Sequence, residues 1–225
     1  MNYFAHGRNY IETPFVLAGT AVPDWLNVVD RRVRARGKLA QPWVHDPDPA
    51  LAGVARGVVL HHHDDAWFHQ TRAFAELSLQ FTVDIRESLP EDTGFRPSFL
   101  GHILVEILLD AALIEQDSGK LDAYYQTLGE LDPEVVSRAM HHMTTGRAER
   151  MPEMIRLFCR ERFLYDYLDD AKLLTRLNRV MCRVKLPELP SSMLTILAGA
   201  RQPVREQLPK LLDGPNTPEF KETRQ

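Results

Sequence analysis

The sequence predicts an all-α protein that forms a single-domain helical bundle. Apolar residues recur at helical spacing along most of the 225 residues, whereas alternating runs of β-branched residues and Asn-Gly hairpin turns are missing. With 44% apolar and 26% charged residues, the composition excludes a largely disordered chain. We expect one domain over residues 1–212 and a flexible tail over 213–225, since the tail is mostly polar and contains Pro and Gly.

The first fifty residues predict two helices followed by a loop. We expect a helix over 13–20, which begins after the N-cap residue Thr13. A second helix is expected over 24–36 and should end at Gly37, a residue typical of helix C-termini. The Pro-rich segment 39–49 is typical of a loop.

Six more segments with helical periodicity follow, and short turn-like sequences separate them. The first of these turns is 90–94, which contains Pro, acidic residues and Gly. The expected helices cover residues 50–89, 97–117, 120–131, 133–145, 151–184 and 191–212.

Charge and cysteine usage exclude several kinds of partner and location. The 27 basic and 31 acidic residues give a net charge of −4, so we expect no nucleic-acid partner. We also expect no membrane association, since no apolar run stands out as long enough to cross a bilayer. Two cysteines cannot build a disulfide framework, and the start of the chain lacks the pattern of a signal peptide. A cytoplasmic location is therefore expected.

Polar residues stand out on the most apolar of the expected helices. Within 99–114, His102, Glu106 and Asp110 are the polar residues, and their spacing of four places them on one helix face. Burying unpaired carboxylates costs several kcal/mol, so this face requires a compensating charge. A cation held between this helix and a facing element would supply it, and a buried arginine is the alternative.

A second run of polar residues with the same spacing lies in the helix expected over 50–89. His61, Asp65 and His69 repeat every four residues, and Arg72 lies on the same stripe. Two helices that each carry histidine and carboxylate could pack face to face and enclose a metal ion. Imidazole with carboxylate suits Mn²⁺, Fe²⁺ or Zn²⁺, whereas Mg²⁺ prefers more oxygen ligands. A single histidine on an apolar stripe is more often a hydrogen-bonded core residue, so the prediction depends on the match between the two runs.

Three blocks of sequence fit a known pattern. The first begins MNYFAH and leads through a segment of small residues to an aspartate, the second is GVVLHHHDDAWF, and the third is ILVEILLDAAL. In this order and spacing, over about the first half of the chain, they resemble the acyl carrier protein phosphodiesterase family. The matching positions are Met1, Asn2, Ala5, His6, Leu17, Gly19, Asp24, Gly57, His61, Asp65, Glu106 and Asp110.

The resemblance implies an all-helical, HD-domain-like phosphohydrolase that uses a divalent metal, with Mn²⁺ expected and Fe²⁺, Mg²⁺ or Zn²⁺ as alternatives. The implied reaction releases 4′-phosphopantetheine from the serine of a holo carrier protein. One departure is that Ala111 stands where the family usually has a histidine after its last aspartate. The residues carried over as metal ligands are His6, Asp24, His61, Asp65 and Asp110.

Further roles follow from these assignments. Asp24 and Asp65 are also candidate catalytic residues, and Arg72 is expected to bind a substrate phosphate. His69, His102 and Glu106 are expected to surround the ligands and orient them.

Three functions are compatible with the sequence. The first is the carrier-protein phosphodiesterase, for which the basic segment 30–38 would dock the acidic carrier protein; the same segment also fits a solvated helix face. The second is a phosphohydrolase that acts on a nucleotide or another small phosphoester. The third is a non-catalytic helical binding protein with a degenerate metal site, which the alanine at position 111 favours.

Overall fold

A computed structural model describes residues 1–89, 94–215, 217, 218 and 220 of the chain. Across these residues the regular structure is helical, and the extended backbone pairing within them is a single antiparallel bridge between Ala35 and Thr144. The predicted all-α class is therefore confirmed. Part of the predicted turn, residues 90–93, lies outside the described residues, as do residues 216, 219 and 221–225 of the predicted tail.

The helices are numbered in chain order, with η denoting short 3₁₀ helices. They are α1 (Tyr3–Gly7), α2 (Pro14–Val29), α3 (Gly37–Ala40), η1 (Gln41–Trp43), α4 (Pro49–Phe68), α5 (Arg72–Ser88), α6 (Pro97–Gln116), α7 (Ser118–Glu130), α8 (Pro133–His141), α9 (Met151–Glu161), η2 (Phe163–Leu168), α10 (Asp170–Arg183) and α11 (Met193–Leu211).

The helix predicted over 24–36 is wrong in its second half. Helix α2 ends at Val29, because the side chain of Asp30 accepts a hydrogen bond from the backbone N–H of Arg32 and turns the chain. Gly37 then begins the short helix α3 instead of ending a helix. The basic segment 30–38 therefore begins with a turn, continues as irregular chain and ends in α3, and does not form one helix face.

Two long helices predicted from periodicity are each divided in the structure. The segment 50–89 forms α4 and α5, because Thr71 accepts a hydrogen bond from the backbone N–H of Phe74 and starts a new helix. The segment 151–184 is interrupted after α9, where Arg162 takes a left-handed conformation with φ of 46°.

The chain divides into two compact units, each assembled from separate segments. The α2 unit comprises Tyr3–Trp67, Asp117–Arg162 and the described residues from Pro215 onward. The α6 unit comprises Met1–Asn2, Phe68–Gln116 and Phe163–Gly214.

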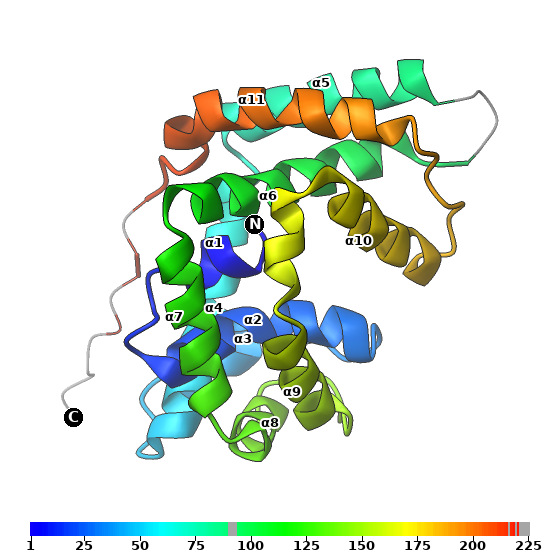
Figure 1. The fold of residues 1–225 in the computed structure, drawn as a ribbon. Coiled ribbons are helices and arrows are strands. Elements are labelled where there is room, and N and C mark those ends of the chain that lie inside the picture. The colour runs from blue at the N-terminus through cyan, green and yellow to red at the C-terminus, as the bar shows by residue number, and fades with distance from the viewer. Residues whose placement is uncertain (90–93, 216, 219, 221–225) are drawn as a thin grey trace. The chain divides into compact units, whose positions relative to one another are not determined.

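Aromatic side chains fill the core of the α2 unit. Trp25 of α2 packs edge-on against Phe158 of α9, with ring centroids 5.4 Å apart. Phe4 of α1 packs edge-on against Tyr124 of α7 at 5.8 Å. The four rings are buried, so α1, α2, α7 and α9 share one core (Figure 1). This core fixes the short helix α1, which carries His6.

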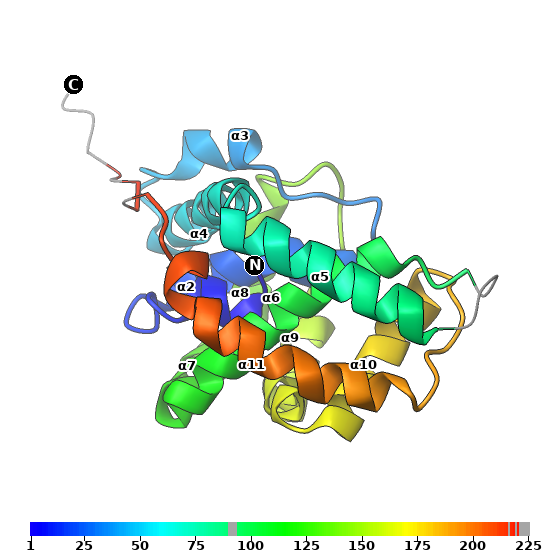
Figure 2. The same cartoon turned by 90° about the horizontal axis from the view of Figure 1, so that it is seen from above.

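In the α6 unit, α5 and α11 run beside α6, as the two views agree (Figures 1 and 2). The central helix α6 is buried on most of its circumference, as the sequence predicted. Leu104 and Leu108 of α6, Phe81 of α5 and Leu197 of α11 are buried, and the three helices contact one another. Of its polar residues, Asp110 is fully buried, whereas His102 and Glu106 are partly exposed.

Helix α6 also has the length and composition of a membrane span, which the sequence analysis did not recognise. Its 20 residues include an 18-residue window of mean hydropathy 1.7. Within the structure, 67% of that window is buried among other parts of the protein. This burial is typical of a core helix and gives the apolar composition an explanation without a bilayer.

Candidate metal centre

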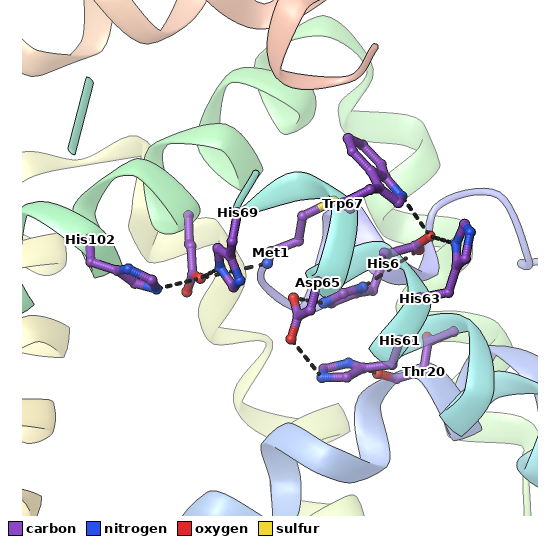
Figure 3. A network of polar contacts seen from close by, with 11 residues as sticks. Met1, His6, Thr20, His61, His63, Asp65, Trp67, His69 and His102 are labelled. Carbon is purple, nitrogen blue, oxygen red and sulfur yellow. Dashed lines mark hydrogen bonds and ion pairs between the residues drawn. The ribbon is translucent and has the colours of Figure 1, made fainter. Parts of the chain in front are cut away.

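Helices α1 and α4 of the α2 unit bring His6, His61 and Asp65 together. Each of the three offers one ligand atom, and these atoms lie within 4.8 Å of one another. His6 is 1% exposed and His61 is 4% exposed, whereas Asp65 is half-buried. Figure 3 shows the Asp65 carboxylate beside both imidazole rings, with one contact to each. We call these three residues the His6 group.

Close contact between α2 and α4 determines where His61 lies. A methyl group built on Gly57 of α4 would lie 2.6 Å from the Cα of Gly19 on α2, so the two backbones meet where neither residue has a side chain. His61 follows Gly57 by one turn, and Thr20 follows Gly19 directly. The glycine contact therefore brings the His61 ring to the backbone of α2.

The backbone of α2 selects the tautomer of His61. Its Nδ1 lies 2.9 Å from the carbonyl oxygen of Thr20, and a carbonyl can only accept a hydrogen bond, so Nδ1 carries the proton. In the neutral ring, Nε2 then presents a lone pair. That lone pair faces Oδ2 of Asp65 at 3.3 Å. A backbone carbonyl that fixes one ring nitrogen and leaves the other as a ligand is common for histidines that bind metals.

Asp65 uses one oxygen for each histidine of the group. Its Oδ1 lies 3.2 Å from Nε2 of His6, and its Oδ2 lies 3.3 Å from Nε2 of His61. Burial by itself would raise the pKa of Asp65, but the close contacts with the imidazole rings of His6 and His61 outweigh burial and hold the pKa well below its usual range. The carboxylate is therefore negatively charged at neutral pH.

The arrangement requires positive charge between its ligand atoms. An Nε2 lone pair opposite a carboxylate oxygen is repulsive unless a proton or a cation lies between them. The rings of His6 and His61 are stacked with their centroids 4.1 Å apart, so their Nε2 atoms face the same carboxylate. A single divalent cation satisfies both nitrogens and the carboxylate at once.

Distances within the His6 group also fit a metal ion. Both ring nitrogens of His6 are buried without an aligned hydrogen bond among the described residues, although each faces a carboxylate. Neighbouring ligands at about 2.1 Å from a tetrahedral ion are about 3.4 Å apart. The nitrogen–oxygen separations of 3.2 Å and 3.3 Å in the group are close to that value. The residues present therefore fit a divalent cation.

Asp64 contributes to this centre, and the sequence analysis missed it. Its Oδ2 lies 3.7 Å from Nδ1 of His6, while its Oδ1 accepts hydrogen bonds from Trp67 Nε1 and His63 Nδ1, both at 3.3 Å. Burial alone would raise the pKa of Asp64, but contacts with His6 and then His63 and Trp67 lower it. Asp64 was not predicted because helical spacing places it on a different face of the helix from His61 and Asp65. The adjacency of two aspartates after three histidines was the available signal.

A second set of ligand atoms lies in the α6 unit, on His69, His102 and Glu106. We call these residues the Glu106 group. Oε1 of Glu106 lies 2.7 Å from Nε2 of His69 and 3.2 Å from Nε2 of His102 (Figure 3). Burial raises the pKa of Glu106, but the amino group of Met1, 3.6 Å from Oε1, and hydrogen bonds from His102 and His69 lower it to about 2.

The remaining predicted site residues lie outside these two groups. Asp24 is on α2, in the same unit as the His6 group. Asp110 is fully buried on α6, in the other unit, and Arg72 is an exposed residue at the start of α5 that pairs with Glu76 at 2.6 Å. The predicted run of His61, Asp65 and His69 is therefore divided between the two groups. His69 follows the end of α4 and contacts Glu106, whereas His61 and Asp65 belong to the His6 group.

Comparison of the chain with protein-family models, with curated proteins and with solved structures finds no match. The resemblance to acyl carrier protein phosphodiesterases and the HD-domain-like type of the fold therefore remain predictions. Fold and geometry define the class more coarsely, as an all-helical protein with two histidine–carboxylate groups able to hold a metal ion.

Proposed function

We propose that this protein binds a divalent cation through His6, His61 and Asp65 and hydrolyses a phosphoester. One observation supports the proposal most: a single carboxylate faces the Nε2 atoms of two buried histidines, and the Thr20 carbonyl fixes the tautomer of one of them. Buried polar groups that lack aligned partners are rare in structural cores, so they favour a ligand-binding role.

A bound divalent cation would supply charge to polarise a phosphoryl oxygen and activate water. The chain's own residues hold the ligand atoms in place. Thr20 fixes His61, and Asp64 faces the far nitrogen of His6 and favours the ring orientation in which Nε2 faces Asp65. Asp24, in the same unit, is the candidate for accepting a proton from water. The proposed metal is Mn²⁺, with Fe²⁺, Zn²⁺ and Mg²⁺ as alternatives.

The proposed substrate is a holo carrier protein, from which 4′-phosphopantetheine would be released. Support comes from the resemblance in the first half of the chain and from the basic segment 30–38, in which Arg31, Arg36 and Lys38 are exposed. Carrier proteins are acidic, so this segment would attract them. A small phosphoester is the second proposed substrate class. Both cysteines, Cys159 and Cys182, are free, which agrees with the proposed cytoplasmic location.

The experiment uses purified full-length protein, stripped of metal with a chelator and reloaded with Mn²⁺. Metal content is measured after dialysis, and hydrolysis is measured with a holo carrier protein and with bis(p-nitrophenyl) phosphate. We expect His61→Asn and Asp65→Asn to lower both metal affinity and hydrolysis at least 100-fold. His45→Asn is the matched control, since His45 is an exposed loop residue, and it should change neither.

Each readout tests a different part of the proposal. If His61→Asn binds metal as tightly as the wild type, the proposed site is wrong. If the metal-loaded protein hydrolyses neither substrate, the protein is a binding protein and the catalytic proposal is wrong. Hydrolysis of the small diester without release of phosphopantetheine would show that the carrier protein is not the substrate, and the proposed phosphohydrolase activity would stand.

A further inference from the structure

We propose that the Glu106 group is a second cation site, specific for a transition metal such as Zn²⁺, Cu²⁺ or Ni²⁺. From the sequence, His69, His102 and Glu106 were expected only to surround and orient the ligands of a metal bound elsewhere. In the structure these residues form a ligand group of their own in the α6 unit, and the His6 group belongs to the α2 unit.

Two different chain segments bring the ligand atoms of this group together. His102 and Glu106 are one turn apart on α6, so both side chains leave the same face of that helix. His69 lies in the turn between α4 and α5. Both Nε2 atoms converge on the same oxygen, Oε1 of Glu106, at 2.7 Å and 3.2 Å. The three ligand atoms lie within 4.8 Å of one another.

An aromatic support holds both imidazole rings. Phe74 of α5 packs edge-on against His69 at 4.8 Å and against His102 at 4.9 Å between ring centroids. Phe68 also packs against the His69 ring, with the centroids 5.4 Å apart. Because Thr71 caps α5 through the N–H of Phe74, the same turn that releases His69 from α4 also places this support. The rings are therefore oriented before a ligand binds, which lowers the entropic cost of binding.

Exposure and ligand chemistry distinguish this group from the buried His6 group. The side chains of His69, His102 and Glu106 are 32%, 43% and 18% exposed, so an ion can enter directly from solvent. Two imidazoles with one carboxylate favour Zn²⁺, Cu²⁺ or Ni²⁺ over Mg²⁺ or Ca²⁺. Three protein ligands at an exposed site leave a coordination position for water or another molecule.

Without a metal, Oε1 of Glu106 accepts hydrogen bonds from two imidazole rings and faces the amino group of Met1 at 3.6 Å. The number of metal ions bound per protein distinguishes a metal site from a hydrogen-bonded cluster, because a cluster that is only hydrogen-bonded binds no ion. We would titrate chelator-stripped, full-length protein with Zn²⁺ and count bound equivalents by calorimetry and by elemental analysis after dialysis. The wild type is expected to bind two equivalents.

Matched variants assign each equivalent to a group. His69→Asn with His102→Asn should bind one equivalent, His61→Asn should bind the other, and the control His45→Asn should bind two. Should the double variant prove unstable, His102→Asn alone alters a side chain that is 43% exposed and should weaken one equivalent at least tenfold. Circular dichroism verifies that each variant is folded.

The proposal is overturned if the double variant, or folded His102→Asn, binds as many equivalents with the same affinity as the wild type. It is also overturned if the wild type binds one equivalent that only His61→Asn removes. Failure of the proposed function looks different: His61→Asn would then leave binding unchanged, while the equivalent held by His69 and His102 would still be lost in the double variant.

Discussion

Asp64 and Asp65 are neighbours on α4 but contact different atoms of the candidate centre. Asp65 faces Nε2 of both histidines, whereas Asp64 faces Nδ1 of His6 and is itself held by Trp67. A carboxylate behind a ligand histidine orients the ring and raises the basicity of its other nitrogen. At the scale of residues, therefore, Asp65 is a direct ligand candidate and Asp64 is a positioning residue.

This distinction predicts a graded response to substitution. Asp64→Asn keeps the shape of the side chain but removes its charge, so metal affinity at the His6 group should fall about 10- to 100-fold. Asp65→Asn should lower it further, because a direct ligand is lost. Calorimetric titration with Mn²⁺ measures the dissociation constant of each variant. Asp213→Asn is the control, because Asp213 is exposed and lies outside both ligand groups. An unchanged dissociation constant for Asp64→Asn would remove Asp64 from the centre.

At the scale of elements, the crossing of α2 and α4 determines the position of His61. Gly19 and Gly57 meet at this crossing, and a methyl group on either one would strike the backbone of the other helix. Backbone atoms cannot move aside as flexible side chains do, so a larger residue must separate the helices. Separation would carry His61 away from the carbonyl oxygen of Thr20.

We therefore predict that Gly57→Ala impairs both stability and metal binding. The free energy of unfolding should fall by about 1–3 kcal/mol or more, and metal affinity should fall because His61 loses its fixed tautomer. Urea denaturation and metal titration measure the two effects.

Gly199→Ala on α11 is the control for this prediction, since a methyl group there meets open space. It should raise the free energy of unfolding by about 0.5–1 kcal/mol, the usual gain of alanine over glycine in a helix. A stable Gly57→Ala protein with unaltered metal affinity would contradict the role given to the crossing.

At the scale of the whole molecule, two compact units each contain one ligand group and a core of their own. The segments of each unit are far apart in the sequence, since the α6 unit includes residues near both ends of the described chain. Metal ions bound to such groups stabilise the folded state, because the unfolded chain does not hold the ligand atoms together.

Metal should therefore raise the stability of the folded protein. At a free Mn²⁺ or Zn²⁺ concentration of about 100 times the dissociation constant, one site adds about 2.7 kcal/mol to the free energy of unfolding. Thermal denaturation with and without metal measures the shift, and a chelator should reverse it. A variant that combines His61→Asn with His102→Asn should show no shift. If neither Mn²⁺ nor Zn²⁺ changes the unfolding temperature of the wild type, binding at both groups is contradicted.

Periodicity alone was sufficient for much of the description. The all-α class, the burial of α6 and the residues of the two ligand groups other than His6 could be predicted, because apolar spacing fixes which face of a helix is buried. His6 came from the family resemblance and not from spacing. Helix ends were predicted less well, since single side-chain hydrogen bonds at Asp30 and Thr71 decide them.

Tertiary structure decided how the candidate residues combine. The sequence placed His61, Asp65 and His69 on one stripe, but α4 ends at Phe68, and the turn that follows carries His69 to Glu106 instead. Asp65 lies with His6, a residue nearly sixty positions earlier in the chain. The physical reason is that residue spacing determines the face of one helix, whereas contact between glycines, a helix cap and the packing of aromatic rings determine which faces meet.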